Sequence, residues 1–268
     1  MGCLTKNVFD EEELRHDNTS ALFGSFGIVS GAPYIWQNPR YASYGKRVKV
    51  IYDNSKDDPD YYEINAYATL TASPEVHIKP GLVSWASVYS IVAAMLFTGN
   101  GSSCINKLCK FTRDNMADCL KTPATMMNLM CAQYNIPTDG YFLDLRARMM
   151  RLMLLFAVAH EFGHICLGHY PLSCGADTGG VSRNDERAAD TFAFATMQSV
   201  GTGEAGAVGA ISMLTGLAMS MGRRRRYDGM HTHPADLERI RNAFSSFANV
   251  LKYSRVKLNT IERIFACK

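Results

Sequence analysis

The sequence lacks paired cysteines. It contains 8 cysteines in 268 residues, but no CxxC pair, and its start does not read as a secretory signal peptide. This pattern excludes the disulfide framework of a small secreted domain. Scattered cysteines fit a reducing compartment, so we expect a cytoplasmic protein.

The chain also lacks a strong excess of charge of one sign. Its 28 Lys and Arg residues nearly balance 25 Asp and Glu residues, which leaves a net charge of +3. This charge is too small to indicate a nucleic-acid partner, so none is expected. The dense basic run 223–226 is interpreted as a solvated loop between helices rather than a phosphate or membrane contact.

A run of about 20 strongly apolar residues, which a membrane-spanning helix needs, is missing as well. Residues 82–97 and 205–221 come nearest, but both stretches are short and contain serines or glycines. We expect both to be buried core helices. A location on the cytoplasmic face of a membrane remains the alternative, because the basic run follows the second stretch.

Strand patterns come early in the chain and helical patterns come late, without alternation of the two. We expect a single domain over 1–268, in which residues 1–40 are irregular and 46–98 form a small sheet and a first helix. Residues 99–140 are interpreted as an insertion with short helical pieces, and 141–268 as a helical part. This order predicts an α+β fold with a small antiparallel or mixed N-terminal sheet and a mainly helical C-terminal half.

The individual elements have recognisable limits. The predicted strands and helices are 47–52, 62–70, 75–79, 82–97, 142–167, 182–199, 205–221 and a final helix from Pro234 to about Phe247. Gly168 ends the long helix, because glycine readily adopts the left-handed conformation of a helix C-terminus. Ser182 and Asp185 have the spacing of a capping box at the next helix start.

An HExxH motif occurs inside the long apolar helix, at His160, Glu161 and His164. Residues four apart lie on one face of a helix, so both histidines can bind one metal ion with Glu161 beside it. A chance match is expected on the order of once in a hundred such chains. The pattern therefore predicts a zinc site in which Glu161 is the general base.

A catalytic zinc ion takes three protein ligands and a water molecule, so a third ligand is required. Glu186 is the best candidate, and Asp190 lies four residues later, where it can accept a hydrogen bond from a ligating histidine. Taken alone, Glu186 would be an ordinary first-turn acid. His169, Asp177 and Cys174 are competing candidates without the same helical support, and we interpret His169 as structural.

His231 and His233 precede the predicted start of the final helix at Pro234. A histidine that enters the cleft from this position could donate a hydrogen bond to the oxyanion of the transition state. A helix-cap region explains the proline, but not the histidines.

Together these motifs resemble the gluzincin peptidases of the HtpX and CAAX-prenyl endopeptidase type. The similar features are HExxH, the ExxxD of Glu186 to Asp190, a later His-Pro, and a strand motif at 64–68. The resemblance implies a zincin-like fold, His160, His164 and Glu186 as Zn2+ ligands, Glu161 as the base, Asp190 behind the ligands, and His233 as a transition-state donor. It also implies that Asn65, Ala66, Tyr67 and Ala68 pair with the substrate backbone.

The size and motifs of the chain also resemble the Lit-type phage-exclusion peptidases, which are cytoplasmic zinc enzymes. The runs around His160–His169 and Glu186–Ala193 are similar to ImmA/IrrE-type regulatory proteases, which lack the later His-Pro. We therefore expect a zinc-dependent endopeptidase that acts on a protein or peptide. The alternatives are a membrane-associated peptidase and a regulatory protein whose structural zinc is closed by His169 or Cys174.

Overall fold

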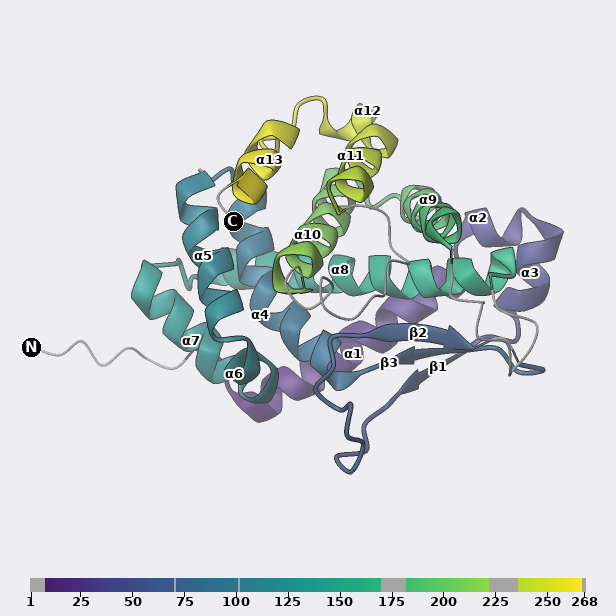
Figure 1. Ribbon diagram of the computed structural model, residues 1–268, viewed down its shortest axis with the longest axis horizontal. Helices are drawn as coiled ribbons and strands as arrows, with labels where there is room; N and C mark the ends of the chain where they lie inside the picture. The colour runs from purple at the N-terminus through teal and green to yellow at the C-terminus, as the bar shows by residue number, and fades with distance from the viewer. Residues whose placement is uncertain (1–7, 70, 101, 170–181, 222–235, 267–268) are drawn as a thin grey trace, which may run out of the picture.

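A long central helix organises the molecule. The computed structural model describes residues 8–69, 71–100, 102–169, 182–221 and 236–266. Helix α8 (Gly140–Leu167) has 28 residues, which gives a length of about 42 Å. Helices α1 (Glu11–Ser30), α4 (Pro80–Phe97), α9 (Arg183–Ser199) and α10 (Gly203–Met221) all pack on it (Figure 1).

Local sequence signals explain both ends of α8. Asp139 caps the first turn by accepting a hydrogen bond from the backbone N–H of Phe142. Gly168 ends the helix in the left-handed conformation, with φ of 73°. The predicted stop at Gly168 is confirmed, and the observed start lies two residues before the predicted one.

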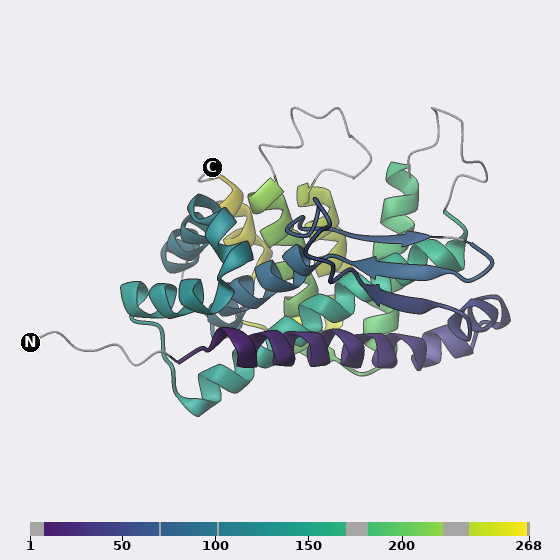
Figure 2. The ribbon, with the colours of Figure 1, turned by 90° about the horizontal axis from the view of Figure 1, so that it is seen from below.

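Three short strands form a mixed sheet beside α8. Strands β1 (Lys49–Tyr52) and β3 (Glu75–Ile78) are parallel, and β2 (Ala66–Thr69) pairs antiparallel with β3, so the order is β1-β3-β2. Val76 and Ile78 face the core, in keeping with the period of two. Strand β2 packs against α8 (Figures 1 and 2). The predicted α+β arrangement with a small mixed sheet is present.

The expectation that residues 1–40 are irregular is wrong. Helix α1 occupies Glu11–Ser30, capped by Asp10, and runs along α8 (Figure 2). Glycines often interrupt helices, but Gly24 and Gly27 are exposed helix positions at which an added Cβ would meet nothing within 4 Å. The buried face is partly polar, because it includes Asn18 and Ser25, so the helical pattern was hidden.

Other helices add to the expected set. They are α2 (Pro33–Trp36), α3 (Pro39–Gly45), α5 (Ser102–Asp114), α6 (Met116–Lys121), α7 (Pro123–Tyr134), α11 (Asp236–Ser246), α12 (Ala248–Leu251) and α13 (Leu258–Ala266). Helices therefore precede as well as follow the strands, contrary to the expected order. The insertion 99–140 contains the short helices that the sequence predicted. The final predicted helix ends at Ser246, and α12 and α13 were not predicted.

The apolar helices are largely enclosed by the rest of the molecule. By length and composition, α4 and α8 could cross a membrane, but 89% and 83% of their most apolar windows are buried inside the structure. Buried core helices of soluble proteins pass the same test. Glycines bring α10 close to this core: a Cβ at Gly216 would lie 2.6 Å from Trp85, and one at Gly209 would lie 2.6 Å from Leu152.

Candidate metal centre

Three buried side chains converge between α8 and α9. His160 and His164 come from α8, and Glu186 comes from the first turn of α9. Each exposes 6% or less of its surface, and one ligand atom from each lies within 4.8 Å of the others. The structure therefore brings together the three residues that the sequence proposed as metal ligands.

The spacing of the ligand atoms suits a small tetrahedral ion. The two Nε2 atoms of His160 and His164 lie 3.2 Å apart. The Glu186 carboxylate oxygens lie 3.2 Å from Nε2 of His160 and 3.6 Å from Nε2 of His164. Zinc bonds of about 2.05 Å at tetrahedral angles separate neighbouring ligand atoms by about 3.3 Å. Two imidazoles and one carboxylate also form a donor set that zinc favours.

Small residues allow α8 and α9 to approach closely enough for this convergence. A Cβ at Gly163 would lie 3.1 Å from the Phe192 ring, and Ala189 is fully buried. The start of α9 is fixed by the predicted capping box, which Ser182 and Asp185 form through both of its hydrogen bonds. Glu186 is the next residue and lies in the first turn of α9.

Asp190 contacts the side of His160 that faces away from Glu186, and Arg239 of α11 holds Asp190 in place. Its Oδ1 is 3.0 Å from Nδ1 of His160, and it accepts two hydrogen bonds from Arg239, at 2.7 and 2.6 Å. Burial opposes ionisation of the carboxyl, but Arg239 and His160 outweigh it and lower the pKa of Asp190 to about 2. A permanently ionised Asp190 orients His160 so that Nε2 faces Glu186.

The protonation of His160 follows from the same neighbours. Burial disfavours the imidazolium, but the carboxylates of Asp190 and Glu186 more than offset this and raise the pKa of His160 to about 10. In the metal-free site, His160 is therefore a cation between two carboxylates. A metal ion that binds through Nε2 must displace this proton.

Glu161 is half-buried, next to His160 in the chain. Desolvation raises its pKa to about 7, with repulsion from Glu186 and Asp190 adding to the shift while His160 and Arg239 oppose it. A carboxyl group with a pKa near 7 exchanges protons readily at neutral pH, as a general base requires.

His169 lies just past the helix end, as expected, but it contacts the centre. Its Nδ1 is 3.2 Å from Nδ1 of His164, and its Nε2 is 3.7 Å from Oδ1 of Asp185. Burial lowers the pKa of His169, although Asp185 and Glu186 oppose the change. His169 therefore meets the nitrogen of His164 that faces away from Glu186.

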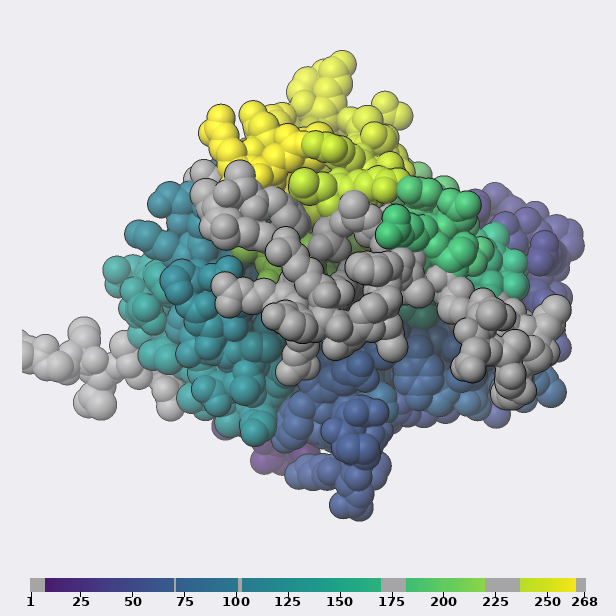
Figure 3. Space-filling view, viewed as in Figure 1, coloured from purple at the N-terminus to yellow at the C-terminus, as the bar shows by residue number. Residues whose placement is uncertain are grey.

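The strand residues proposed for substrate binding lie in and beside β2, which packs against α8. Ala66, Tyr67 and Ala68 lie in β2, and Asn65 precedes it and accepts a hydrogen bond from the backbone N–H of Lys79. Within the described part of the chain, β2 pairs on one side only, with β3. The sheet (blue) and α9 (green) appear on the same face of the molecule (Figure 3).

Other proposed residues cannot be placed. His231, His233, Asp177, Cys174 and the basic run 223–226 lie outside the described residues. Sequence reasoning missed the contacts of Arg239 and of His169. No local pattern distinguishes Arg239 from the exposed arginines of the chain, although only 5% of its surface is exposed in the structure.

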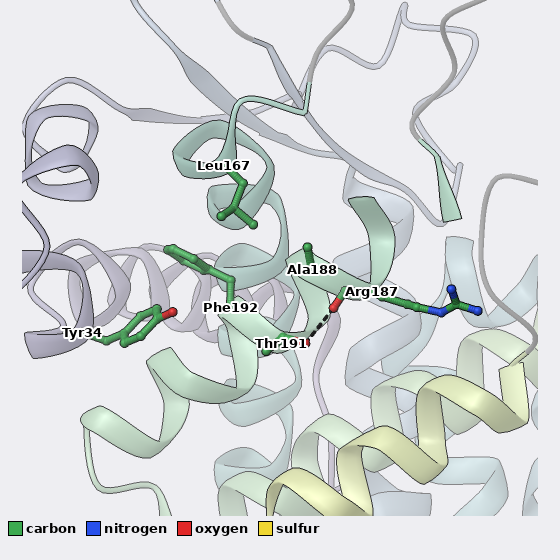
Figure 4. Close-up of a pocket in the computed structure, with 6 residues that line it drawn as sticks. All are labelled: Tyr34, Leu167, Arg187, Ala188, Thr191 and Phe192. Atoms are coloured by element: carbon green, nitrogen blue, oxygen red, sulfur yellow. Dashed lines mark hydrogen bonds between the residues drawn. The ribbon is translucent and has the colours of Figure 1, made fainter. Parts of the chain in front are cut away.

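A separate pocket of about 380 Å³ lies on another side of α9 (Figure 4). It is lined by Tyr34, Leu167, Arg187, Ala188, Thr191 and Phe192. None of the three converging ligand residues lines it, so it is distinct from the metal centre.

Comparison with known proteins supports a peptidase. Residues 147–255 match the family model of Peptidase U49. The matched segment covers less than half of the chain, but it includes His160, His164, Glu186, Asp190 and Arg239. The match supports a hydrolase of the Lit type and does not single out the HtpX and CAAX-prenyl endopeptidase type. No curated protein and no solved structure shows significant similarity to the chain.

Proposed function

We propose that this protein is a zinc-dependent endopeptidase of the Lit type with a zincin-like active site. The observation that carries the proposal is the convergence of His160, His164 and Glu186, with ligand atoms within 4.8 Å, inside a segment that matches a peptidase family. The HExxH helix lies beside a mixed sheet in which β2, within the described residues, pairs on one side only, and this supports the zincin-like arrangement.

The three converging side chains are the proposed zinc ligands. Bound there, zinc would act as a Lewis acid toward the scissile carbonyl and make a water molecule acidic at neutral pH. The role of Asp190 is to keep Nε2 of His160 directed at the ion, because its carboxylate engages Nδ1. Arg239 holds that carboxylate in place through two hydrogen bonds.

Glu161 is the proposed general base. It would take a proton from the attacking water and return it to the leaving amine. The raised pKa of its carboxyl, about 7, suits both transfers, since neither the acid nor the base form is strongly preferred. His233 is proposed as a donor to the transition state on the strength of the sequence alone.

The proposed substrate is an extended segment of a protein or peptide. Strand β2 offers unpaired backbone groups on one side within the described residues, and it packs against α8. An extended chain that adds to such an edge gains main-chain hydrogen bonds in a fixed register. Asn65, Ala66, Tyr67 and Ala68 would in this way align the scissile bond with the zinc ligands.

We further propose that the enzyme acts in the cytoplasm. Cys104, Cys109, Cys119, Cys131 and Cys166 are free thiols in the described part of the chain, which suits a reducing compartment. The burial of α4 and α8 supports a soluble molecule over a membrane-associated one. Partition of the expressed protein between buffer and detergent phases would distinguish the two.

Metal analysis and peptide cleavage test the proposal together. We expect about one zinc ion per chain in the wild type and in Glu161→Gln, because that change leaves the ligands intact. Peptide cleavage by Glu161→Gln should fall about 10²- to 10⁴-fold, since only the base is lost. Glu186→Ala should lose zinc as well as cleavage.

Circular dichroism provides the folding control for each variant. A well-folded wild type that binds no zinc after chelation and reloading would contradict the metal site. Cleavage by Glu161→Gln at the wild-type rate would contradict the role of the base, while leaving the metal site in place.

A further inference from the structure

We propose that His169 and Asp185 form a second orienting pair, which positions His164 for the metal as Asp190 positions His160. This inference rests on the proposed function, because it assigns residues that support the same metal centre. In this proposal His169 is neither a purely structural residue nor a fourth metal ligand. It orients one of the ligands.

The turn after α8 brings His169 to His164. Gly168 has φ of 73°, and the backbone N–H of His169 donates to the carbonyl of His164 at 3.1 Å. The N–H of Gly168 also donates to Ile165, so the two bonds form a Schellman motif. This reversal folds His169 back over the last helical turn, next to the ligand five residues earlier.

The contacts of the two rings agree on one proton arrangement. Nε2 of His164 faces His160 and Glu186, so a metal ion would take its lone pair and leave the proton on Nδ1. This Nδ1 lies 3.2 Å from Nδ1 of His169, which must therefore accept. A neutral His169 then carries its own proton on Nε2, which faces Oδ1 of Asp185 at 3.7 Å.

Asp185 is held independently of His169. Its other oxygen, Oδ2, accepts a hydrogen bond from the backbone N–H of Ser182 at 2.9 Å, as part of the capping box of α9. Asp185 also precedes Glu186 in the chain. The pair therefore connects the end of α8, which carries His164, to the start of α9, which carries the third ligand.

The two orienting groups differ in strength. Asp190 is an ionised and buried carboxylate, whereas His169 is a neutral acceptor whose side chain is 11% exposed. Hydrogen bonds to charged acceptors are the stronger ones. Loss of His169 should therefore weaken metal binding less than loss of Asp190.

Zinc titration of the metal-free protein against a competing chromophoric chelator tests the proposal. Removing the acceptor with His169→Leu should weaken zinc affinity by about 10- to 100-fold. His169→Asn should restore much of the affinity, because its Oδ1 can accept near the former position of Nδ1. The absorption bands of the cobalt-loaded protein should change in His169→Leu and return toward the wild type in His169→Asn.

Ser182→Ala is the matched control. It removes the cap hydroxyl, yet it keeps the backbone N–H that holds Asp185. Zinc affinity should therefore stay within about twofold of the wild type. Equal affinities of His169→Leu and the wild type would overturn the proposal, and so would an equal loss in His169→Asn and His169→Leu.

One further measurement uses the wild-type protein, so it does not depend on the folding of a variant. Nitrogen NMR of the zinc-loaded wild type should show His169 protonated on Nε2 and His164 protonated on Nδ1; a proton on Nδ1 of His169 would contradict the proposal.

His160→Ala separates failure of the proposed metal site from failure of the orienting pair. If it binds zinc as the wild type does, the metal site itself is wrong; if it loses zinc while His169→Leu does not, only the orienting pair fails.

Discussion

At the scale of single residues, buried charge is concentrated behind the ligand set. Asp190 and Arg239 expose 2% and 5% of their surfaces and form a two-bond pair. A buried charge is costly when it has no partner, so each group depends on the other. The pair therefore couples the stability of the fold to the geometry of His160.

Arg239→Met should lower the free energy of unfolding by about 3–5 kcal/mol, because it leaves the Asp190 carboxylate buried without its guanidinium. Urea unfolding measures this loss. Arg241→Met, two residues away on the same helix, is the matched control: Arg241 pairs with Glu262 at 2.8 Å, but its side chain is 58% exposed. That change should cost about 1 kcal/mol or less. Similar losses in the two variants would contradict this interpretation.

Short-range spacing made most of the centre predictable. His160 and His164 lie on one face of α8, and Glu186 and Asp190 lie on one face of α9. The spacing of four residues within each helix therefore predicted these four residues of the centre. The contact of Arg239 with Asp190 spans 49 positions, and no local pattern indicates it. The contact of His169 with His164 depends on the chain reversal at Gly168. The sequence predicted that the helix ends at Gly168, but not the direction that the chain takes after it.

At the scale of elements, the close approach of α8 and α9 sets the ligand geometry. Gly163 faces Phe192, which also packs edge-on against Tyr34 and Tyr41, at 5.4 and 5.3 Å between ring centroids. Because the ring is held on two sides, it cannot easily move away from a larger residue at position 163.

Two glycine substitutions should therefore have opposite effects. Gly163→Ala should destabilise the fold by about 1–3 kcal/mol, since its Cβ would lie 3.1 Å from Phe192. Gly24→Ala, at an exposed helix position with nothing within 4 Å, should stabilise it by about 0.5–1 kcal/mol. Urea unfolding of both variants checks the pair. A stabilising Gly163→Ala would mean that the two helices have room to separate.

The elements differ in how well the sequence predicts them. Helices α4 and α9 have clear signals, an apolar run after Pro80 and a capping box at Ser182, and both were predicted within three residues. Helix α1 has a comparable start signal, the Asp10 cap followed by three glutamates, but it lacks a sharply apolar face, and packing on α8 stabilises it. Tertiary packing on α8, which the sequence does not reveal, therefore accounts for helix α1.

At the scale of the whole molecule, protons and the proposed metal ion would compete for the same site. The folded protein raises the pKa of His160 to about 10, from about 6.5 in an unfolded chain. The corresponding stabilisation is complete below pH 6.5 and is lost as the pH rises toward 10. The pKa of Glu161 is also raised, to about 7, so this group too contributes stability at low pH that is lost as the pH rises toward 7.

The metal-free protein should therefore be less stable at pH 9 than at pH 6.5, whereas the increase in Tm on adding zinc should grow over that range. Thermal unfolding at both values, with and without zinc, measures the two trends. His160→Ala is the control, and it should reduce the first trend and abolish the second. A metal-free wild type that gains stability toward pH 9 would contradict the assignment.

The distance along the chain between Arg239 and the HExxH motif has a consequence for biosynthesis. A growing chain that has emerged only as far as α8 presents two histidines, without Glu186, Asp190 or Arg239. The carboxylates follow with α9, and the guanidinium that holds Asp190 arrives only with α11. The proposed protease is expected to stay inactive on the ribosome until α11 has been made, which would protect neighbouring nascent proteins from premature cleavage.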